Sequence, residues 1–265
     1  MDQGEDQLEE ELDRYRAPAL DKGLDILELL SEQEHGLTRG DIVKALGRKP
    51  NEIYRMVERL VARQYLTRSV GGDRYSLSLK LFSLAHRYPP VNRLIAEALP
   101  HMHTFAKTAE QSCHLAVYDE GSVVIVAQVD GPGVWGLSIR LGSRVSLLNT
   151  GSGHVLLAFQ NEQQRARMLS EHREVEGEIP MTTEAINRTL ATVTELGHEE
   201  MDSLQTAGVF NVSFPILGSD GHAIAALTTP YLRRLDQRSA PSLHEVRSCL
   251  QRAATALSMM PPSPT

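Results

Sequence analysis

Hydrophobic residues between positions 18 and 61 recur at the spacing of three amphipathic helices. The first predicted helix follows Pro18 and runs to about Ser31. The second begins after Thr38, whose hydroxyl can cap the first turn, and ends at Gly47. The third begins at Pro50, because the fixed φ of proline suits a first helical turn. Its apolar stripe lies at i, i+3, i+4, i+7 and i+8 and comprises Ile53, Met56, Val57, Leu60 and Val61.

Two short segments after the third helix have the pattern of a β-hairpin. Residues 65–68 and 74–77 are rich in strand-forming side chains and flank the pair Gly71-Gly72. Two helices joined by a glycine-containing turn form the outline of a helix-turn-helix, and a hairpin after them would be its wing. We therefore predict a winged helix-turn-helix domain over residues 17–79, with the first helix bracing the other two.

The pattern changes at Tyr88-Pro89-Pro90, which breaks the helical periodicity. We predict a linker helix over residues 80–90 and a second domain over residues 91–260. Strands and helices alternate in that domain, which is typical of an α+β fold. The predicted strands are 114–118, 123–127, 136–140, 209–216 and 223–229, and the predicted helices are 91–110, 152–160, 162–171, 183–196 and 242–258.

Charge is distributed unevenly along the chain. Residues 36–80 contain ten Lys and Arg against four Asp and Glu, a balance of +6, whereas the whole chain has a formal net charge of −7. A cationic segment in an acidic protein is the electrostatic footprint of a phosphate-binding module, and we expect double-stranded DNA as its partner. The less favoured alternative is a solvated basic helical pair.

The polar side of the third helix supplies the side chains that we expect to reach DNA. Arg55 lies opposite the apolar stripe, while Arg68 and Arg74 flank the glycine turn of the hairpin. The full expected set is Arg39, Lys49, Asn51, Glu52, Tyr54, Arg55, Arg59, Arg68 and Arg74.

Composition restricts the class of protein further. The 265 residues are 41% hydrophobic and 23% charged, which is ordinary for a globular protein. No apolar run approaches the roughly 20 residues of a membrane helix, and the acidic N-terminus is no secretory signal. We therefore expect a cytoplasmic protein without a membrane contact. Cys113 and Cys249 belong to no CxxC pair, so neither a zinc finger nor a disulfide framework is indicated.

The segment from Leu148 to His154, LNTGSGH, reads as a strand end, a glycine-rich turn and a helix start. Backbone N–H groups at such a helix start are free to bind a carboxylate or a phosphate. From spacing alone, an anion site and a plain tight turn are equally favoured.

Four segments together resemble the IclR family of bacterial transcription regulators: ALDKGLDILELL, GLTRGDIVKALG, NEIYRMVERLVARQYL and GGDRYSLSLKLFSLA. The resemblance extends over about residues 17–259. It implies a GAF-like second domain in which a curved sheet covers a ligand pocket, and it raises the anion-binding interpretation of the glycine turn to the favoured one. The family usually has an Arg at the position of Arg55, but it keeps a Ser or Thr pair where this chain has Asn51-Glu52.

The resemblance also implies which residues complete the pocket. Asn211 and Thr228 offer neutral donors and acceptors that suit ligand hydroxyl groups, whereas Met201 stands where some members have an acidic residue. Trp135 could stack on a ligand ring or fill the core. The expected effector-binding set is Trp135, Leu137, Gly151, Ser152, Gly153, Met201, Asn211 and Thr228.

Two chemical alternatives are less favoured. Ser152 and His154 do not face each other at helical i and i+2, and GSG is not the G-x-S-x-G of a hydrolase, so we predict no catalytic residues and no enzyme. The chain contains ten histidines, and His101, His103, His114 and His154 could be considered, together with Cys113, as metal ligands. Structural or exposed histidines are favoured, and we predict no metal and no cofactor.

We thus predict a DNA-binding regulator whose operator binding is controlled by a small organic acid, either a sugar acid or an aromatic acid. A homodimer or a dimer of dimers is expected, because paired half-sites multiply specificity. The alternative is an enzyme or metal-dependent sensor of a small carboxylate with an accessory basic domain. The identity of the effector, the operator sequence and the choice between repressor and activator stay open.

Overall fold

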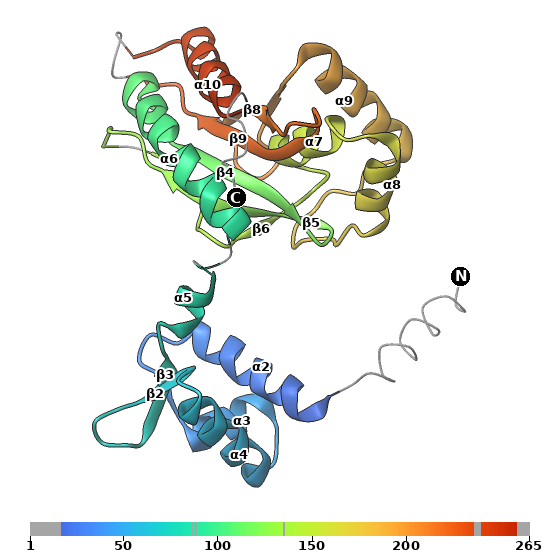
Figure 1. Cartoon of the computed structure of the whole chain (residues 1–265). Helices are drawn as coiled ribbons and strands as arrows, with labels where there is room; N and C mark the ends of the chain where they lie inside the picture. The colour runs from blue at the N-terminus through green and yellow to red at the C-terminus, as the bar shows by residue number, and fades with distance from the viewer. Residues whose placement is uncertain (1–16, 86, 88, 135, 236–239, 259–265) are drawn as a thin grey trace. The chain divides into compact units, whose positions relative to one another are not determined.

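The computed structural model describes residues 17–85, 87, 89–134, 136–235 and 240–258, and Figure 1 shows the chain. The chain divides into two compact units, with the division between Pro89 and Pro90. No helix among the described residues is both long enough and apolar enough to cross a membrane.

The first unit is a three-helix core with a small antiparallel sheet. Strand order in the sheet is β1-β3-β2, and β2 and β3 form the predicted hairpin. The elements are α2 (Pro18–Ser31), β1 (Leu37–Thr38), α3 (Arg39–Leu46), α4 (Pro50–Ala62), β2 (Leu66–Arg68), β3 (Arg74–Leu77) and α5 (Lys80–Ala85).

Local sequence explains where the helices of this unit begin and end. The Thr38 hydroxyl accepts a hydrogen bond from the Asp41 amide at 3.2 Å, and the Asp41 carboxylate accepts one from the Thr38 amide at 3.1 Å. This reciprocal capping box starts α3, and Gly47 ends it in the left-handed conformation at φ 60°. The core that holds the helices together consists of Ile26, Leu30, Ile42, Ile53, Val57, Leu66 and Tyr75.

The second unit is a six-stranded antiparallel sheet in the order β6-β5-β4-β9-β8-β7, with helices on both faces. Helices α6 and α10 pack on one face, and α7, α8 and α9 pack on the other (Figure 1). The strands are β4 (Cys113–Asp119), β5 (Ser122–Val129), β6 (Arg144–Val145), β7 (Glu199–Asp202), β8 (Phe210–Leu217) and β9 (Ala223–Tyr231). The helices are α6 (Pro89–Ala109), α7 (Gly151–Ala158), α8 (Glu162–Ser170), α9 (Thr183–Leu196) and α10 (Leu243–Ser258).

The structure corrects several of the sequence-based expectations. Apolar spacing predicts a strand over residues 136–140, but they form irregular chain, and the edge strands of the sheet are instead β6 and β7. These two strands contain only two and four residues, so their apolar alternation is too short to recognise. The linker helix predicted over 80–90 ends at Ala85, and Pro89 and Pro90 begin α6, since proline is tolerated in a first helical turn.

Candidate functional site

Helix α4 presents a polar face on which two arginines pair with no carboxylate of the described residues. Ile53 and Val57 are fully buried, whereas Arg55 and Arg59 are exposed on the other side of the helix. Neither arginine contacts a carboxylate among the described residues. Two unpaired guanidinium groups on one exposed helix face can donate to phosphates or to the edges of bases.

The aromatic ring of Tyr54 on the same face is covered by a neighbouring cation. The Arg39 guanidinium lies 4.9 Å from the centre of the Tyr54 ring, and Tyr54 is 47% exposed. This cation–π contact orients both side chains where the start of α3 lies against the exposed face of α4. Lys49 and Asn51, at the start of α4, are exposed as well.

Three side chains of the predicted DNA-contacting set have partners within the unit. Glu52 forms an ion pair with Lys22 of α2 at 3.3 Å, so its carboxylate is turned toward the core helix. Arg68 pairs with Glu58 and also lies 5.2 Å from the centre of the Tyr75 ring. Arg74 donates to the Gly36 carbonyl at 3.1 Å. These three residues brace the hairpin and α4 against their neighbours, which the sequence pattern did not indicate.

In the second unit, the glycine turn is the amino-terminal end of α7. Thr150 caps the helix and accepts a hydrogen bond from the Gly153 amide at 3.1 Å. The amides of Gly151 and Ser152 have no acceptor among the described residues. These two N–H groups and the positive pole of the helix form a favourable position for an anion.

A cavity of about 170 Å³ opens at this end of α7. Five of the eight predicted effector-binding residues line it, namely Leu137, Gly151, Ser152, Asn211 and Thr228. The lining residues outside the predicted effector-binding set are His114, Ser138, Ile139, Val145, Thr150, Ser203, Gln205, Thr206, Val209 and Pro230.

Two of the other three predicted residues, Gly153 and Met201, do not line the cavity. A side chain on Gly153 would point into the Leu147 backbone, because an added Cβ would lie 2.1 Å from its carbonyl oxygen. Met201 lies on the edge strand β7, opposite Asn211, without reaching the cavity. Trp135 lies outside the described residues.

A row of five polar side chains crosses the sheet beneath α7. Strand register places Gln128, His114, Thr228, Ser213 and Glu199 opposite one another on β5, β4, β9, β8 and β7. Cross-strand neighbours in register share one face of a sheet. His114 and Thr228 are the members of the row that line the cavity, and they give it a polar floor within an otherwise apolar layer.

Hydroxyl groups of this row connect to the helix above it. The Ser152 hydroxyl lies 2.8 Å from the Thr228 hydroxyl, which in turn donates to the Ser213 hydroxyl at 2.8 Å. The Nε2 atom of His114 is 3.5 Å from the Ser152 hydroxyl, while its Nδ1 atom is buried and has no partner among the described residues.

Burial lowers the pKa of His114 from 6.5 to about 4, so the imidazole is neutral at physiological pH. No carboxylate in the described part of the chain orients this ring. With so low a pKa as well, His114 is poorly suited to activate Ser152 as a nucleophile. The close Ser–His pair therefore gives no support to hydrolysis.

We expect this histidine to make the fold sensitive to acid. The unfolded chain protonates its histidine near pH 6.5, whereas the folded protein does so only near pH 4, so stability falls as the pH drops from about 6.5 to about 4. His114→Gln should remove roughly 2 kcal/mol of the stability difference between pH 7 and pH 5, as measured by urea unfolding. An unchanged difference would show that the imidazole does not titrate as buried.

His154 has a structural role, which differs from the metal-binding and catalytic roles that the sequence alternatives would give it. Its Nδ1 atom is 2.7 Å from Glu199 Oε2, and its Nε2 atom donates to the Leu148 carbonyl at 2.7 Å. The contact with Glu199 is buried and joins α7 to β7, whereas the part-buried contact with Leu148 joins α7 to the turn before it. Burial also raises the pKa of the Cys113 thiol to about 12, which disfavours the thiolate that metals bind. The described residues contain no group of three possible metal-ligating side chains.

Comparison with known proteins identifies the family. The profile described as "Bacterial transcriptional regulator IclR C-terminal" matches residues 87–259, and the profile described as "IclR helix-turn-helix domain" matches residues 19–69. The chain belongs to the IclR family. It is therefore a transcriptional regulator with a DNA-binding helix-turn-helix and a C-terminal effector domain.

Named relatives agree with the IclR assignment. The HTH-type transcriptional regulator KdgR of Escherichia coli is 28% identical over 238 residues, which are 88% of each chain. XynR of the same organism is 26% identical over 91% of this chain and 95% of its own.

The IclR fold is also that of two crystal structures. An IclR homolog from Microbacterium hydrocarbonoxydans complexed with 4-hydroxybenzoate has a TM-score of 0.74 at 24% identity, covering 91% of this chain and 97% of its own. The Thermotoga maritima IclR has a TM-score of 0.72 at 21% identity, covering 90% and 96%.

Proposed function

We propose that this regulator binds operator DNA through the exposed face of α4 and that a small hydroxylated carboxylic acid, bound at the start of α7, controls that binding. The observation that carries the effector assignment is the combination of two free backbone amides with a cavity whose described lining contains no Asp, Glu, Lys or Arg. The charge of an anionic ligand would be met by the amides and the helix dipole.

The neutral polar lining favours a ligand with several hydroxyl groups. Hydroxyl and amide side chains at Ser138, Thr150, Ser203, Gln205 and Asn211 surround the cavity, in addition to Ser152 and Thr228. Such groups can both donate and accept, which suits the hydroxyls of a sugar acid. An aromatic acid has fewer polar groups with which to satisfy the hydroxyl and amide side chains of the cavity. The Microbacterium hydrocarbonoxydans homolog is nevertheless complexed with 4-hydroxybenzoate.

Effector control would act by differential affinity. A ligand that binds one arrangement of the protein more tightly shifts the population toward that arrangement and thereby changes the affinity for DNA. A homodimer or dimer of dimers would let this shift change the spacing of paired helix-turn-helix units.

We expect a thermal-shift screen to identify the ligand class. A sugar acid such as gluconate should raise the melting temperature more than benzoate or a neutral sugar, because a ligand present at about 100 times its Kd stabilises the native state by about 2.7 kcal/mol. A screen in which no sugar acid stabilises the protein would contradict the assignment of a hydroxylated effector to the cavity at α7.

A matched pair of threonines tests the site itself. Thr228 faces the cavity, whereas Thr229 on the same strand donates to the Ser112 carbonyl at 2.7 Å on the other side. Thr228→Val and Thr229→Val each replace one buried hydroxyl by a methyl group and keep the shape of the side chain. Both should lower the melting temperature of the free protein, but only Thr228→Val should weaken the ligand, by about 1 kcal/mol. Equal ligand affinity in the two variants would exclude Thr228 from the site.

A further inference from the structure

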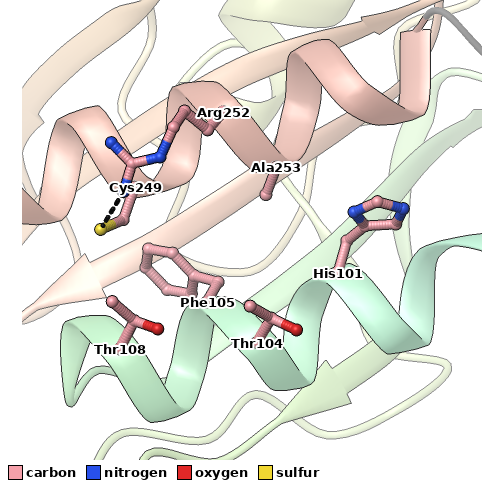
Figure 2. A pocket seen from close by; sticks show the side chains of 7 residues that line it. All are labelled: His101, Thr104, Phe105, Thr108, Cys249, Arg252 and Ala253. Carbon is pink, nitrogen blue, oxygen red and sulfur yellow. Dashed lines mark hydrogen bonds between the residues drawn. The ribbon is translucent and has the colours of Figure 1, made fainter.

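A second hollow lies on the opposite face of the sheet, between α6 and α10. Its volume is about 150 Å³, close to that of the cavity at α7. Figure 2 shows the side chains of the two helices facing each other across it. The lining residues are His101, Thr104, Phe105, Thr108, Cys249, Arg252 and Ala253, and we refer to this hollow as the α6–α10 groove.

The guanidinium of Arg252 is the charged group of the α6–α10 groove. Its Nη2 atom donates to the Cys249 sulfur at 3.0 Å, and no carboxylate of the described residues pairs with it. Sulfur is a weak acceptor, so most of the five N–H donors of this arginine are left for solvent or a ligand. On the same helix, Arg247 is instead paired with Glu200 at 3.2 Å.

The remaining polar groups fit an anion as well. Thr108 has no hydrogen-bond partner among the described residues, and the imidazole of His101 stands at the other end of the α6–α10 groove (Figure 2). The hydroxyl of Thr104 is already used, since it donates to the Pro100 carbonyl at 2.9 Å. No acidic side chain of the described residues lines the groove, although residues 81–265 carry eighteen Asp and Glu against fourteen Lys and Arg.

The floor of the α6–α10 groove is apolar and well packed. Phe105 is 3% exposed and Ala253 is 8% exposed, and both belong to the core that fixes α6 and α10 against the sheet. A cationic edge beside an apolar floor complements a carboxylate that has a short apolar body.

We propose that the α6–α10 groove is a second ligand site, which takes a small monocarboxylate with an apolar body through Arg252 and Thr108. Helix α6 and helix α10 each supply part of the site, so a bound ligand would join the two helices. The site lies across the sheet from α7 and is independent of the proposed effector cavity.

The two cysteines allow occupancy of the groove to be measured directly. Cys249 is partly exposed and lines the groove, whereas Cys113 is fully buried and its pKa is raised to about 12. Iodoacetamide should therefore alkylate Cys249 alone, because the thiolate displaces iodide and Cys113 has neither access nor a thiolate. Intact-mass spectrometry gives the rate of this single modification.

Benzoate is the probe, and benzyl alcohol is its neutral counterpart. With benzoate at about ten times its Kd, the alkylation rate of Cys249 should fall about tenfold, since only the free fraction reacts. Benzyl alcohol and sodium chloride at the same concentration should leave the rate unchanged. Protection is expressed for each variant as the ratio of the alkylation rates with and without benzoate. A substitution that changes the intrinsic reactivity of Cys249 changes both rates equally and leaves this ratio unaffected.

Two arginine variants on one helix decide the result. Arg252→Met should abolish protection by benzoate, whereas Arg247→Met, which removes the same charge outside the groove, should retain it. Isothermal titration of the same pair in a Cys249→Ser chain repeats the comparison without the thiol. The proposal would be overturned if benzoate protected Cys249 equally in Arg252→Met and in the unchanged protein. It would also be overturned if benzoate did not slow alkylation in the unchanged protein.

Discussion

Arg55→Ala is expected to weaken operator binding by one good base contact, about 1–3 kcal/mol, or roughly fivefold to 150-fold. The arginine is exposed on α4 and has no carboxylate partner among the described residues, so its donors are available to DNA. The loss should be specific to the operator, because nonspecific DNA is held through phosphates by the whole basic unit. The measurement is a fluorescence-anisotropy titration with an operator selected from random DNA.

Arg63→Ala is the matched control for this prediction. Arg63 follows the last residue of α4, and its substitution removes the same charge from the carboxyl end of the helix. It should lower the affinities for operator and nonspecific DNA by similar, smaller factors. If Arg55→Ala changed both affinities equally, as Arg63→Ala does, Arg55 would contact phosphate and not a base.

Gly153→Ala is expected to destabilise the second unit by about 3 kcal/mol or more, at the upper end of what overpacking usually costs. An added Cβ would lie 2.1 Å from the Leu147 carbonyl oxygen and 2.6 Å from the Leu147 carbonyl carbon. These are backbone atoms, so no side-chain rotation can relieve the contact. Urea unfolding followed by circular dichroism measures the loss.

Gly151→Ala separates stability from ligand binding at the same helix end. Its added Cβ would meet the Ser213 hydroxyl at 2.5 Å, which is the tip of a side chain and can move by rotation. We expect a smaller loss of stability, together with a weaker effector, because the movement disturbs the hydroxyl chain to Thr228. Equal destabilisation by the two substitutions would show that the Leu147 backbone is not the obstacle at Gly153.

The sequence predicted those parts of the fold that depend on local chemistry. The capping box of Thr38 and Asp41, the stop at Gly47 and the start at Pro50 each depend on residues within a few positions. The order of the helices and of the longer strands followed from apolar spacing in the same way, apart from the strand wrongly predicted over residues 136–140. Edge strands β6 and β7 were missed because a two- or four-residue strand is defined by its partner and not by its own pattern.

The candidate sites were predictable only in part, for a related reason. The glycine turn of α7 could be recognised because a helix start is local, but the polar row beneath it depends on the register of five strands. His114 therefore carried no signal in the sequence beyond being a histidine in a strand. Glu52 and Arg68 looked available on a helical or hairpin surface, yet Lys22 and Glu58 engage them. Pairing of side chains across elements cannot be read from spacing along one element.

The polar row from Gln128 to Glu199 also constrains how the sheet can assemble. If β9 slipped by one residue, Thr228 would turn toward the apolar layer beneath α6 and α10, and Leu227 would turn toward the cavity. Such a slip would bury a hydroxyl without a partner and would remove the contacts that Thr228 makes with Ser152 and Ser213. His114 and Thr228, the members of the row that line the cavity, thus also discriminate against misaligned strands. Evolution toward a new ligand cannot replace them freely with apolar residues without making the alternative alignments of the sheet more accessible.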